Sequence, residues 1–302
     1  RTYPVAHHET GRDQRVQSPI RQVTGKGLNV SRALHTLGAD TVGIMPCHDF
    51  AWGFVGPIVD QEQFEVIQIP GPPGFRAGFA LVEPDGQSTC YLENGLQWAD
   101  ETSSTFMDHI SETIGNRSPE LVVLAGSTPP NAPEDLYAQI ARLCQKTSTP
   151  VVLDATGTSL LRALDVGVLG AKINLEEFSD TFGTTFKDDD SFSTELNNLR
   201  EKYKLEFFGV TAGGGSAFFS QPSRTYKATP PIIEVRNPVG CGDSLLAGLL
   251  HARGKNLPEQ EIIQLAMAAG SANAENLSVA TFEHERVQQL KKDVTLNAIV
   301  KD

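Results

Sequence analysis

The second part of the chain alternates short apolar runs with longer stretches whose apolar residues follow a helical spacing. The runs with the length and continuous hydrophobicity of buried strands are 120–125, 151–154, 171–173 and 207–211. A helical stretch follows each of the first three, most clearly at 133–147. Strands separated by helices are typical of βαβ units, so this pattern predicts an α/β protein with a parallel sheet covered on both faces.

The pattern changes between residues 64 and 95, where strand-like runs follow one another without intervening helices. These runs are 64–69, 76–82 and 87–92. Asp85-Gly86 is a typical hairpin turn between the last two. Together with residues 2–23, the runs are expected to form a small antiparallel sheet beside the main domain. Because no internal repeat or low-complexity linker interrupts the sequence, residues 1–302 are predicted to be a single domain.

Composition and charge exclude several classes of protein. A chain with 39% hydrophobic and 21% charged residues is an ordinary globular protein, and no apolar run is long enough to span a membrane. The first residues lack the apolar core of a signal peptide. A net charge of −12 disfavours nucleic acid or an anionic membrane as partner. The four cysteines form no Cys-x-x-Cys pair, so we expect reduced thiols, no structural metal and a cytoplasmic location.

The strongest local motif is Asn-Pro-Val-Gly-Cys-Gly-Asp-Ser at 237–244, which follows a strand-like run at 232–235 and precedes an apolar helix. Two glycines at a helix start let backbone N–H groups converge on an anion, and the helix N-terminus favours negative charge. Asp243 could then take a proton from a hydroxyl that attacks a bound phosphate. The alternative is a tight turn with Asp243 as a helix cap. The sequence contains no Gly-x-x-x-x-Gly-Lys-Ser/Thr Walker loop. It also lacks a dinucleotide fingerprint here, because Leu245 occupies the third glycine position of that motif.

A second motif is Gly25-Lys26-Gly27-Leu28-Asn29, directly before an amphipathic helix. Close backbone approach at the glycines, the Lys26 ammonium and the Asn29 amide suit a polyol or a phosphate. Gly-Lys-Gly is also an ordinary loop leading into a helix, and the motif alone leaves both interpretations open.

Taken together, the two motifs resemble the two signature regions of the PfkB sugar kinases, which have the ribokinase-like fold. Further segments resemble family motifs in the same order, and they are Ala125–Pro130, Asp154–Gly157, Asn174–Glu177, Val210–Gly213 and Ala269–Ala274. The resemblance covers nearly the whole chain. It implies a three-layer α/β/α sandwich with a mainly parallel sheet and a small β-sheet lid, whose strands lie within about 2–23 and 64–95.

The resemblance also implies a reaction, the transfer of a phosphoryl group from MgATP to a sugar hydroxyl. Asp243 would be the general base. The backbone amides of Gly240, Cys241 and Gly242 would hold the charge that develops on the moving phosphoryl group.

Five residues would form the nucleotide side of the site. Asn174 and Glu177 would organise Mg²⁺, directly or through water, the alternative being that they cap a helix. Thr211, Gly213 and Asn273 would line the ATP pocket, and the alternative for Asn273 is a helix-surface amide.

The sugar side most resembles the phosphosugar branch of the family, which contains 1-phosphofructokinase and tagatose-6-phosphate kinase. The implied substrate is fructose 1-phosphate, fructose 6-phosphate or tagatose 6-phosphate, and the product is a bisphosphate. The implied substrate-binding residues are Gly25, Lys26, Gly27, Asn29, Arg76, Ser127 and Asp154. The alternatives are a kinase of an unphosphorylated sugar or nucleoside, and a catalytically silent sugar-binding relative. A nucleotide-binding oxidoreductase is disfavoured by the absent fingerprint.

The sequence departs from the family pattern at a few positions. The family's first strand, with an aspartate that binds sugar hydroxyls, would fall before Arg1, so we expect it to lie outside these 302 residues. Phe75 replaces a common threonine, and Cys90 stands where some relatives carry a further arginine, which bears on substrate choice. Ile173 and Cys241 replace a proline and an alanine. Lids of this family often pair, so a homodimer through the β-lid is expected.

Overall fold

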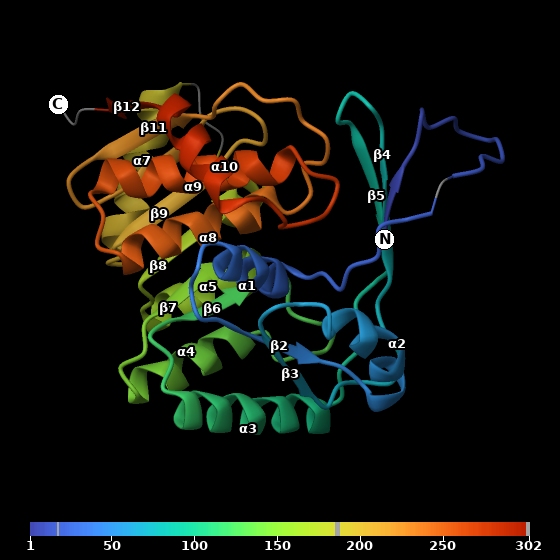
Figure 1. Cartoon of the computed structure of the whole chain (residues 1–302). Helices are drawn as coiled ribbons and strands as arrows, with labels where there is room; N and C mark the ends of the chain where they lie inside the picture. The colour runs from blue at the N-terminus through green and yellow to red at the C-terminus, as the bar shows by residue number, and fades with distance from the viewer. Residues whose placement is uncertain (17, 185–187, 300–302) are drawn as a thin grey trace. The chain divides into compact units, whose positions relative to one another are not determined.

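The computed structural model describes residues 1–16, 18–184 and 188–299 (Figure 1). The chain forms two compact units, each of which is described by itself. Unit 1 combines Arg1–Leu96 with Pro231–Val294, and unit 2 combines Gln97–Pro230 with the C-terminal segment from Thr295. Among the described residues, no helix has both the length and the apolar character needed to cross a membrane.

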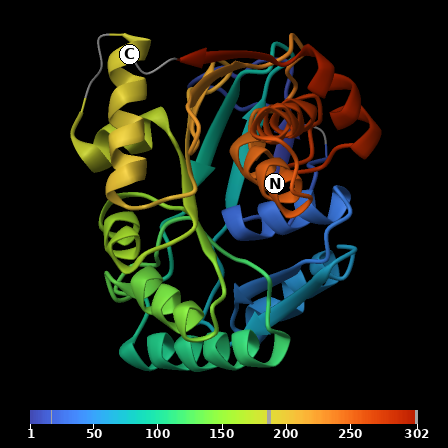
Figure 2. The same ribbon diagram turned by 90° about the vertical axis from the view of Figure 1, so that its left-hand side faces the viewer.

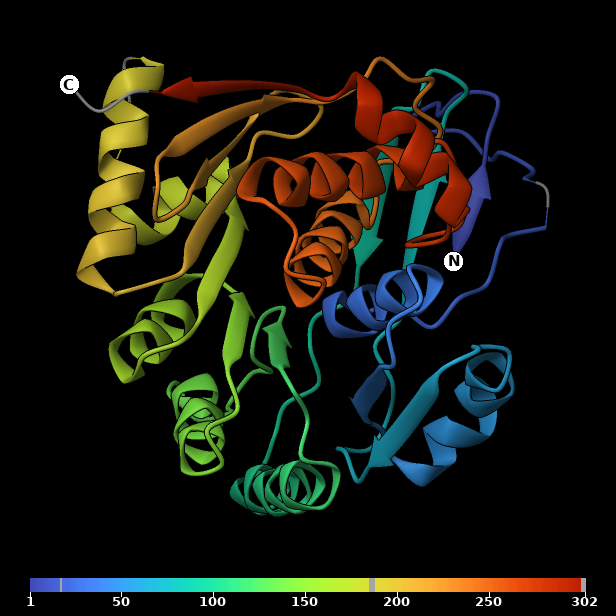
Figure 3. The ribbon, with the colours of Figure 1, turned by 60° about the vertical axis from the view of Figure 1, so that its left-hand side comes forward.

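Unit 2 contains a seven-stranded sheet with the strand order β12-β11-β10-β9-β8-β7-β6 (Figure 3). Its strands are β6 (Val122–Ala125), β7 (Val151–Asp154), β8 (Gly170–Asn174), β9 (Phe207–Thr211), β10 (Ala217–Ser220), β11 (Thr225–Thr229) and β12 (Thr295–Ile299). Strands β6 to β9 are parallel, and β10 to β12 continue the sheet in antiparallel pairing. The predicted parallel sheet is therefore confirmed over its first four strands.

Helix α3 (Asp100–Arg117) precedes the first parallel strand of unit 2. The helices that connect the parallel strands are α4 (Leu136–Lys146), α5 (Gly157–Val166), α6 (Leu175–Phe182) and α7 (Asp189–Lys202). Strands β6 to β9 lie side by side in chain order, and parallel crossovers are right-handed, so α4 to α7 fall on one face of the sheet (Figure 3). The carboxyl ends of the four parallel strands consequently lie together at one edge.

An aromatic cluster holds α6 and α7 on this sheet. Phe178 lies with ring centroids 5.3 Å from Phe192 and 6.0 Å from Phe208. On the other face of β9, Gly170 leaves room for the Phe207 ring, since a Cβ at Gly170 would meet that ring at 2.3 Å. Such contacts are close-packed, and they fix how each strand end is presented at the site.

The main helices of unit 1 are α1 (Lys26–Thr36), α8 (Cys241–Gly254), α9 (Glu259–Ala274) and α10 (His284–Leu290), followed by the short η1 (Lys291–Asp293). Helices α8 and α9 lie against each other, and α1 packs beside α8 (Figure 2). Gly248 permits the close approach, since a Cβ there would lie 2.9 Å from the Ala269 Cβ. Residues Asp243–Ala252 of α8 are all buried, so the helix is held in the core of unit 1 from its third residue onward.

Unit 1 also contains two small sheets. One comprises β1 (Thr2–Pro4), β4 (Gly78–Val82) and β5 (Ser88–Leu92), here termed the lid sheet, and the other comprises β2 (Val42–Pro46) and β3 (Glu65–Ile69), joined through α2 (Asp49–Val59). The predicted Asp85-Gly86 hairpin is confirmed, with Gly86 at φ 81° between antiparallel β4 and β5.

Two expectations about this region are wrong. The run at 64–69 does not join the lid sheet, because β3 pairs in parallel with β2, a strand that the sequence analysis missed. The lid sheet is mixed rather than antiparallel, since β1 runs parallel to β4.

The run at 232–235 is not a strand either. Ile232 is fully exposed, so its hydrophobicity does not reflect burial in a sheet. The chain is instead attached by backbone bonds just beyond this run, where the amides of Arg236 and Asn237 both donate to the Ala274 carbonyl. This attachment to the end of α9 places the glycine motif that follows.

Candidate functional site

The glycine motif forms a turn, here termed the glycine turn (residues 237–242), at the start of α8. Gly240 is the N-cap at φ 83°, and a Cβ there would lie only 2.6 Å from Val279 Cγ1, so the position requires glycine. The buried Asn237 side chain supports the turn by accepting from the Val239 amide at 3.1 Å and donating to the Leu277 carbonyl at 2.8 Å. The first amides of a helix have no partner within the helix, so the turn suits an anion. One departure from the expected cradle is that the Cys241 amide donates to the Pro238 carbonyl at 3.3 Å.

Asn273 supports this turn from α9. Its amide donates to the Val239 carbonyl at 2.9 Å, and its Oδ1 accepts from the Ala280 amide at 2.6 Å. The side chain is completely buried, so the alternative of a helix-surface amide is wrong. The observed contacts make Asn273 a support of the turn, while a direct contact with ATP stays a prediction.

The structure brings the two glycine motifs together within unit 1. Asn29 on α1 donates from Nδ2 to Oδ2 of Asp243 at 2.7 Å. Both side chains are buried, Asn29 being 5% and Asp243 6% exposed. Asp243 is the third residue of α8 and Gly240 is the N-cap, so Asp243 is not the cap of this helix. A carboxylate in the first turn, with an amide donor beside it, is positioned to receive a proton.

The two predicted phosphate-binding cations also lie in unit 1. Lys26 is the first residue of α1, after Gly25, and is half-buried. Arg76 is exposed just before β4, and its Nε donates to the Glu93 carbonyl at 2.5 Å. Phosphate contacts for both side chains stay predictions.

In unit 2, predicted residues gather at the carboxyl ends of the parallel strands. Asp154 ends β7 and is the register partner of Ala125 at the end of β6. Gly126 and Ser127 follow Ala125 directly in the chain. Asn174 ends β8 and is the register partner of Thr211 at the end of β9. This edge is where open α/β sheets bind ligands, as the motif spacing predicts.

Asp154 has a structural contact that the sequence analysis did not foresee. Its carboxylate is fully buried and pairs with the Lys172 ammonium on β8 at 2.9 Å. Its backbone carbonyl accepts from the Gly126 amide at 2.8 Å, which places the turn that carries exposed Ser127. Lys172 was missed, although a lysine within the buried run Ala171-Lys172-Ile173 signals a buried partner. The observed contacts support a positioning part for Asp154, and its contact with sugar stays a prediction.

Asn174 and Glu177 form a reciprocal capping box at the start of α6. The Glu177 amide donates to Asn174 Oδ1, and the Asn174 amide donates to Glu177 Oε2, both at 2.8 Å. Their capping role is thus observed. Hard amide and carboxylate oxygens also fit Mg²⁺, which in kinases is held through one or two carboxylates, substrate phosphates and water. Within the described ranges, no group of three or more acidic, histidine or cysteine side chains could hold a metal ion. Mg²⁺ binding by Asn174 and Glu177 stays a prediction.

Thr211 and Gly213 form the transition from β9 to β10. Gly213 has φ 57°, a left-handed conformation that favours glycine, and the Gly215 amide donates to the Ala212 carbonyl at 3.0 Å. The turn exposes Gly213 and half-buries Thr211. Both residues lie at the carboxyl end of the parallel strand β9, and their contact with ATP stays a prediction.

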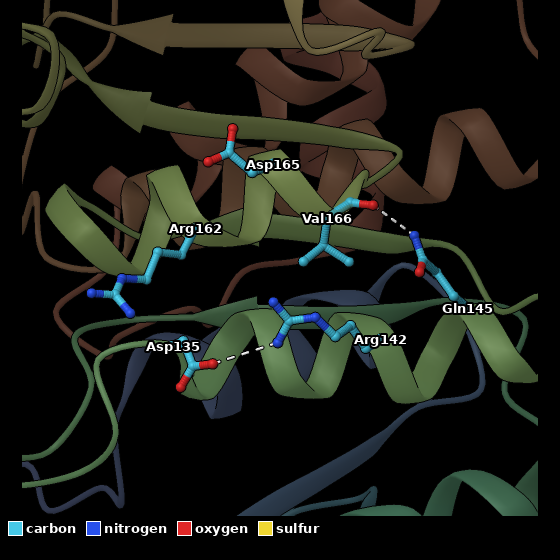
Figure 4. Close-up of a pocket in the computed structure, with 6 residues that line it drawn as sticks. All are labelled: Asp135, Arg142, Gln145, Arg162, Asp165 and Val166. Atoms are coloured by element: carbon cyan, nitrogen blue, oxygen red, sulfur yellow. Dashed lines mark hydrogen bonds and ion pairs between the residues drawn. The ribbon is translucent and has the colours of Figure 1, made fainter.

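A separate hollow of about 590 Å³ lies between α4 and α5 (Figure 4). Arg142 pairs there with Asp135 at 3.4 Å, and Arg162 pairs with Glu134 at 2.6 Å. Because both arginines are already matched by carboxylates, the hollow has no surplus charge for an anion. None of the predicted site residues line it.

Within unit 1, a buried carboxylate beside a glycine turn at a helix start is an arrangement that suits phosphoryl transfer. Residues 74–286 match the pfkB family of carbohydrate kinases. The chain belongs to this family and is an ATP-dependent sugar kinase.

The relatives are phosphosugar kinases. The chain is 30% identical over 281 residues to 1-phosphofructokinase of Bacillus subtilis, covering 91% of this chain and 88% of the relative. It is 27% identical over 302 residues to tagatose-6-phosphate kinase of Staphylococcus epidermidis, covering 97% and 94%. A solved structure of a possible 1-phosphofructokinase from Thermotoga maritima has a TM-score of 0.89 at 17% identity, covering 99% and 96%. The ribokinase-like fold class predicted from the sequence is confirmed.

Proposed function

We propose that the protein transfers the γ-phosphoryl group of ATP to a hydroxyl of a ketohexose phosphate, giving a bisphosphate and ADP. The substrate is fructose 1-phosphate, fructose 6-phosphate or tagatose 6-phosphate. The observation that carries the proposal is the buried Asn29–Asp243 contact at the start of α8, directly beside the Gly240 turn. The relatives named 1-phosphofructokinase and tagatose-6-phosphate kinase support a phosphosugar as the acceptor.

Asp243 acts as the general base in this proposal. Its carboxylate accepts the proton of the acceptor hydroxyl while the hydroxyl oxygen bonds to the γ-phosphorus. The bond between that phosphorus and the β–γ bridging oxygen breaks, and ADP leaves. The amides of Gly240 and Gly242 stabilise the charge on the moving group, because such transfers depend chiefly on positioning and charge neutralisation. The Cys241 amide joins them once it leaves the Pro238 carbonyl.

The strand ends of unit 2 carry most of the residues proposed for the nucleotide and Mg²⁺. Asn174 and Glu177 would hold Mg²⁺ through ATP phosphates and water, and the ion would neutralise phosphate charge. Thr211 and Gly213 contact the nucleotide, and Asn273 in unit 1 keeps the glycine turn in place.

Two cations supply the selectivity for a phosphorylated sugar. A protein with a net charge of −12 repels a dianionic substrate at long range, so capture needs local positive charge. Lys26 and Arg76 provide it, Arg76 with a guanidinium that can hold two phosphate oxygens at once. Gly25, Gly27 and Asn29 contact the sugar from the start of α1, and Ser127 does so from the turn beside Asp154.

The lid sheet supports a homodimer. Phe79 on β4 stacks with Tyr91 on β5 at 5.0 Å between centroids, and both side chains are close to half exposed. Neighbouring Leu92 is 67% exposed, on the opposite face of the strand. An exposed aromatic pair such as Phe79 and Tyr91 is typical of an interaction surface, and a second copy of the same sheet would cover it.

The test of the proposed function is Asp243→Asn in an assay of ADP release with a panel of phosphorylated and free sugars. The variant retains the size and hydrogen bonding of the side chain but cannot accept the proton. We expect kcat to fall by roughly 10²–10⁴, the usual contribution of a positioned general base. The KM values for ATP and sugar should stay within about threefold of the parent if binding is unaffected.

Asp108→Asn on the exposed surface of α3 is the matched control and should leave kcat unchanged. An Asp243→Asn enzyme within about threefold of the parent kcat would show that Asp243 is not the base.

A further inference from the structure

Arg32 on α1 has a buried guanidinium whose three nitrogens are all engaged. Nε and Nη2 donate to the two carboxylate oxygens of Glu62, at 2.9 and 2.5 Å, and Nη2 also donates to the Val23 carbonyl at 2.8 Å. Nη1 donates to Oδ1 of Asn29 at 3.2 Å. The Arg32 side chain is 9% and the Glu62 side chain 14% exposed. A bidentate pair with so little solvent contact fixes the guanidinium in one orientation.

That fixed guanidinium decides which way the Asn29 amide faces. The two ends of an asparagine amide have nearly the same shape, so their neighbours determine the orientation. A guanidinium has donors only, so Oδ1 of Asn29 must face Arg32. Nδ2 then faces Asp243, where it makes the 2.7 Å hydrogen bond. The reversed amide would set oxygen against the carboxylate and N–H groups against the guanidinium, two repulsive contacts.

A second connection runs from Arg32 to the glycine turn. Nη1 of Arg32 also lies 3.4 Å from the Val279 carbonyl, which accepts in addition from the Gln22 amide at 3.2 Å. The side chain of Val279 lies against Gly240, where even a Cβ would come within 2.6 Å. Arg32 therefore contacts both neighbours of the catalytic helix start, Asn29 on one side and the segment at Val279 on the other.

We infer that Arg32 is a positioning residue, which orients the Asn29 amide and thereby holds the Asp243 carboxylate where it can receive the proton. The inference rests on the proposed function, because it requires that Asp243 is the base. A general base must lie within hydrogen-bond reach of the proton it removes. Loss of Arg32 should therefore lower kcat more than it raises either KM.

The test is Arg32→Lys in the complete enzyme. Lysine keeps a charge for Glu62 but cannot reach Glu62, Val23 and Asn29 together. We expect kcat to fall about tenfold to a hundredfold, the effect of misplacing a reacting group by about an ångström. KM values for ATP and sugar phosphate should stay within about threefold. A second variant, Arg32→Met combined with Glu62→Met, covers the case in which Arg32→Lys does not fold. An apolar pair commonly replaces a buried ion pair without loss of stability. This double variant should show the same loss of kcat.

A double-mutant cycle identifies the route of the effect. If Arg32 acts through Asn29, Arg32→Lys should lower kcat no further in an Asn29→Ala background. Arg286→Lys is the matched control, since Arg286 forms a comparable bidentate pair with Glu275 at 2.8 and 2.7 Å. It should leave kcat unchanged.

Two results overturn the inference. The first is a kcat within about threefold of the parent in both Arg32→Lys and the double methionine variant. The second is that Arg32→Lys lowers kcat as much in the Asn29→Ala enzyme as it does in the parent. Asp243→Asn, measured beside them, separates the two hypotheses. If it keeps its kcat, the proposed function fails, and the inference fails with it. If it is inactive while Arg32→Lys is unaffected, only the inference about Arg32 fails.

Discussion

At the scale of single residues, the candidate chemistry depends on buried polar groups with matched partners. Asp243 and Asn29 are far apart in the sequence and meet because α1 packs on α8. Asp154 and Lys172 meet across two neighbouring strands. A buried polar group without a partner costs free energy, so each of these contacts holds its side chain in one place. Arg76 is different, since it is exposed and its predicted function is to meet a ligand from solvent.

Arg76→Ala tests that function. Charge-assisted hydrogen bonds contribute about 1.5–3 kcal/mol each, so the KM for the sugar phosphate should rise roughly tenfold to a hundredfold. The KM for ATP should stay nearly unchanged. Initial-rate kinetics with fructose 1-phosphate, fructose 6-phosphate and tagatose 6-phosphate provide the measurement.

Free fructose serves as the control substrate, because it lacks the phosphate and its slow reaction should be unaffected by Arg76→Ala. Equal kcat/KM values for ribose and the ketohexose phosphates would favour a kinase of an unphosphorylated sugar. An unaltered sugar-phosphate KM would make Arg76 a surface residue of the lid sheet.

The predicted site residues differed in how well the sequence specified their contacts. The motifs located the start of α8 and the strand ends at Asn174 and Thr211, because helix starts and strand ends follow from local patterns. They did not reveal the contact between Asn29 and Asp243 or the pairing of Asp154 with Lys172, because these partners are distant in the chain. The same holds for the contacts of Arg32 with Glu62 and Val279. Nor did they distinguish Asn273 on a surface from Asn273 inside the protein, since only packing determines burial.

At the scale of elements, the hydrophobic pattern correctly predicted a strand where every residue of the strand is buried. The run 151–154 is buried at every position and forms β7 as predicted. Strand β2 was missed because Gly43 and Pro46 interrupt its apolar run. The run at 64–69 was correctly identified as a strand, but its partner could not be predicted, because pairing depends on β2 and on the α2 connection between them.

The capping box at the start of α6 allows the metal function of Glu177 to be separated from its structural function. Glutamine at this position still accepts from the Asn174 amide, so Glu177→Gln should leave the thermal midpoint nearly unchanged. If Glu177 organises Mg²⁺, the Mg²⁺ concentration for half-maximal rate should rise about tenfold, as for other groups around a bound metal. Mg²⁺ titrations of the initial rate, with Glu176→Gln in the same turn as control, give the comparison. An unchanged Mg²⁺ requirement would leave Glu177 as a cap alone.

Helix α8 should also make stability depend on pH. Burial, followed by the nearby charges of Lys255 and His284, lowers the pKa of His251 below its ordinary value of 6.5. At acidic pH the unfolded chain therefore binds a proton at His251 more readily than the folded chain does. The stabilising contribution of neutral His251 to the folded state is complete above about pH 6.5 and is lost as the pH falls through the lowered pKa. Thermal midpoints should therefore fall between about pH 7.5 and about pH 5.5, and fall less in His251→Gln. His8→Gln, at an exposed histidine, should behave as the parent; equal falls in all three proteins would contradict the assignment.

At the scale of the whole molecule, the charge and the exposed apolar groups influence association. A net charge of −12 opposes nonspecific association, so a dimer needs a complementary apolar face. On one face, the lid sheet offers the stacked pair Phe79 and Tyr91. A second exposed aromatic pair, Phe50 and Phe54, lies on α2 outside the lid sheet.

Phe79→Ser with Tyr91→Ser should convert the proposed dimer to a monomer, because the stacked rings supply most of the apolar surface that a second copy would cover. Light scattering coupled to gel filtration measures the mass. Phe50→Ser on α2 is the control and should remain dimeric. If the parent protein is a monomer, the dimer proposal is wrong. If Phe50→Ser dissociates the dimer and the lid-sheet variant does not, the interface lies on α2.

The position of β12 has a consequence for how the protein is made. This last strand pairs with β11, and about 65 residues of chain separate the two, so β11 leaves the ribosome long before its neighbour exists. At synthesis rates of about 5–20 residues per second, the edge stays open for on the order of ten seconds. An open edge exposes unpaired N–H and C=O groups that can recruit another chain. Unit 1 likewise needs Pro231–Val294 before it is complete, so neither unit can complete its fold from its N-terminal segment alone. The β11 edge is therefore exposed to aggregation until β12 emerges.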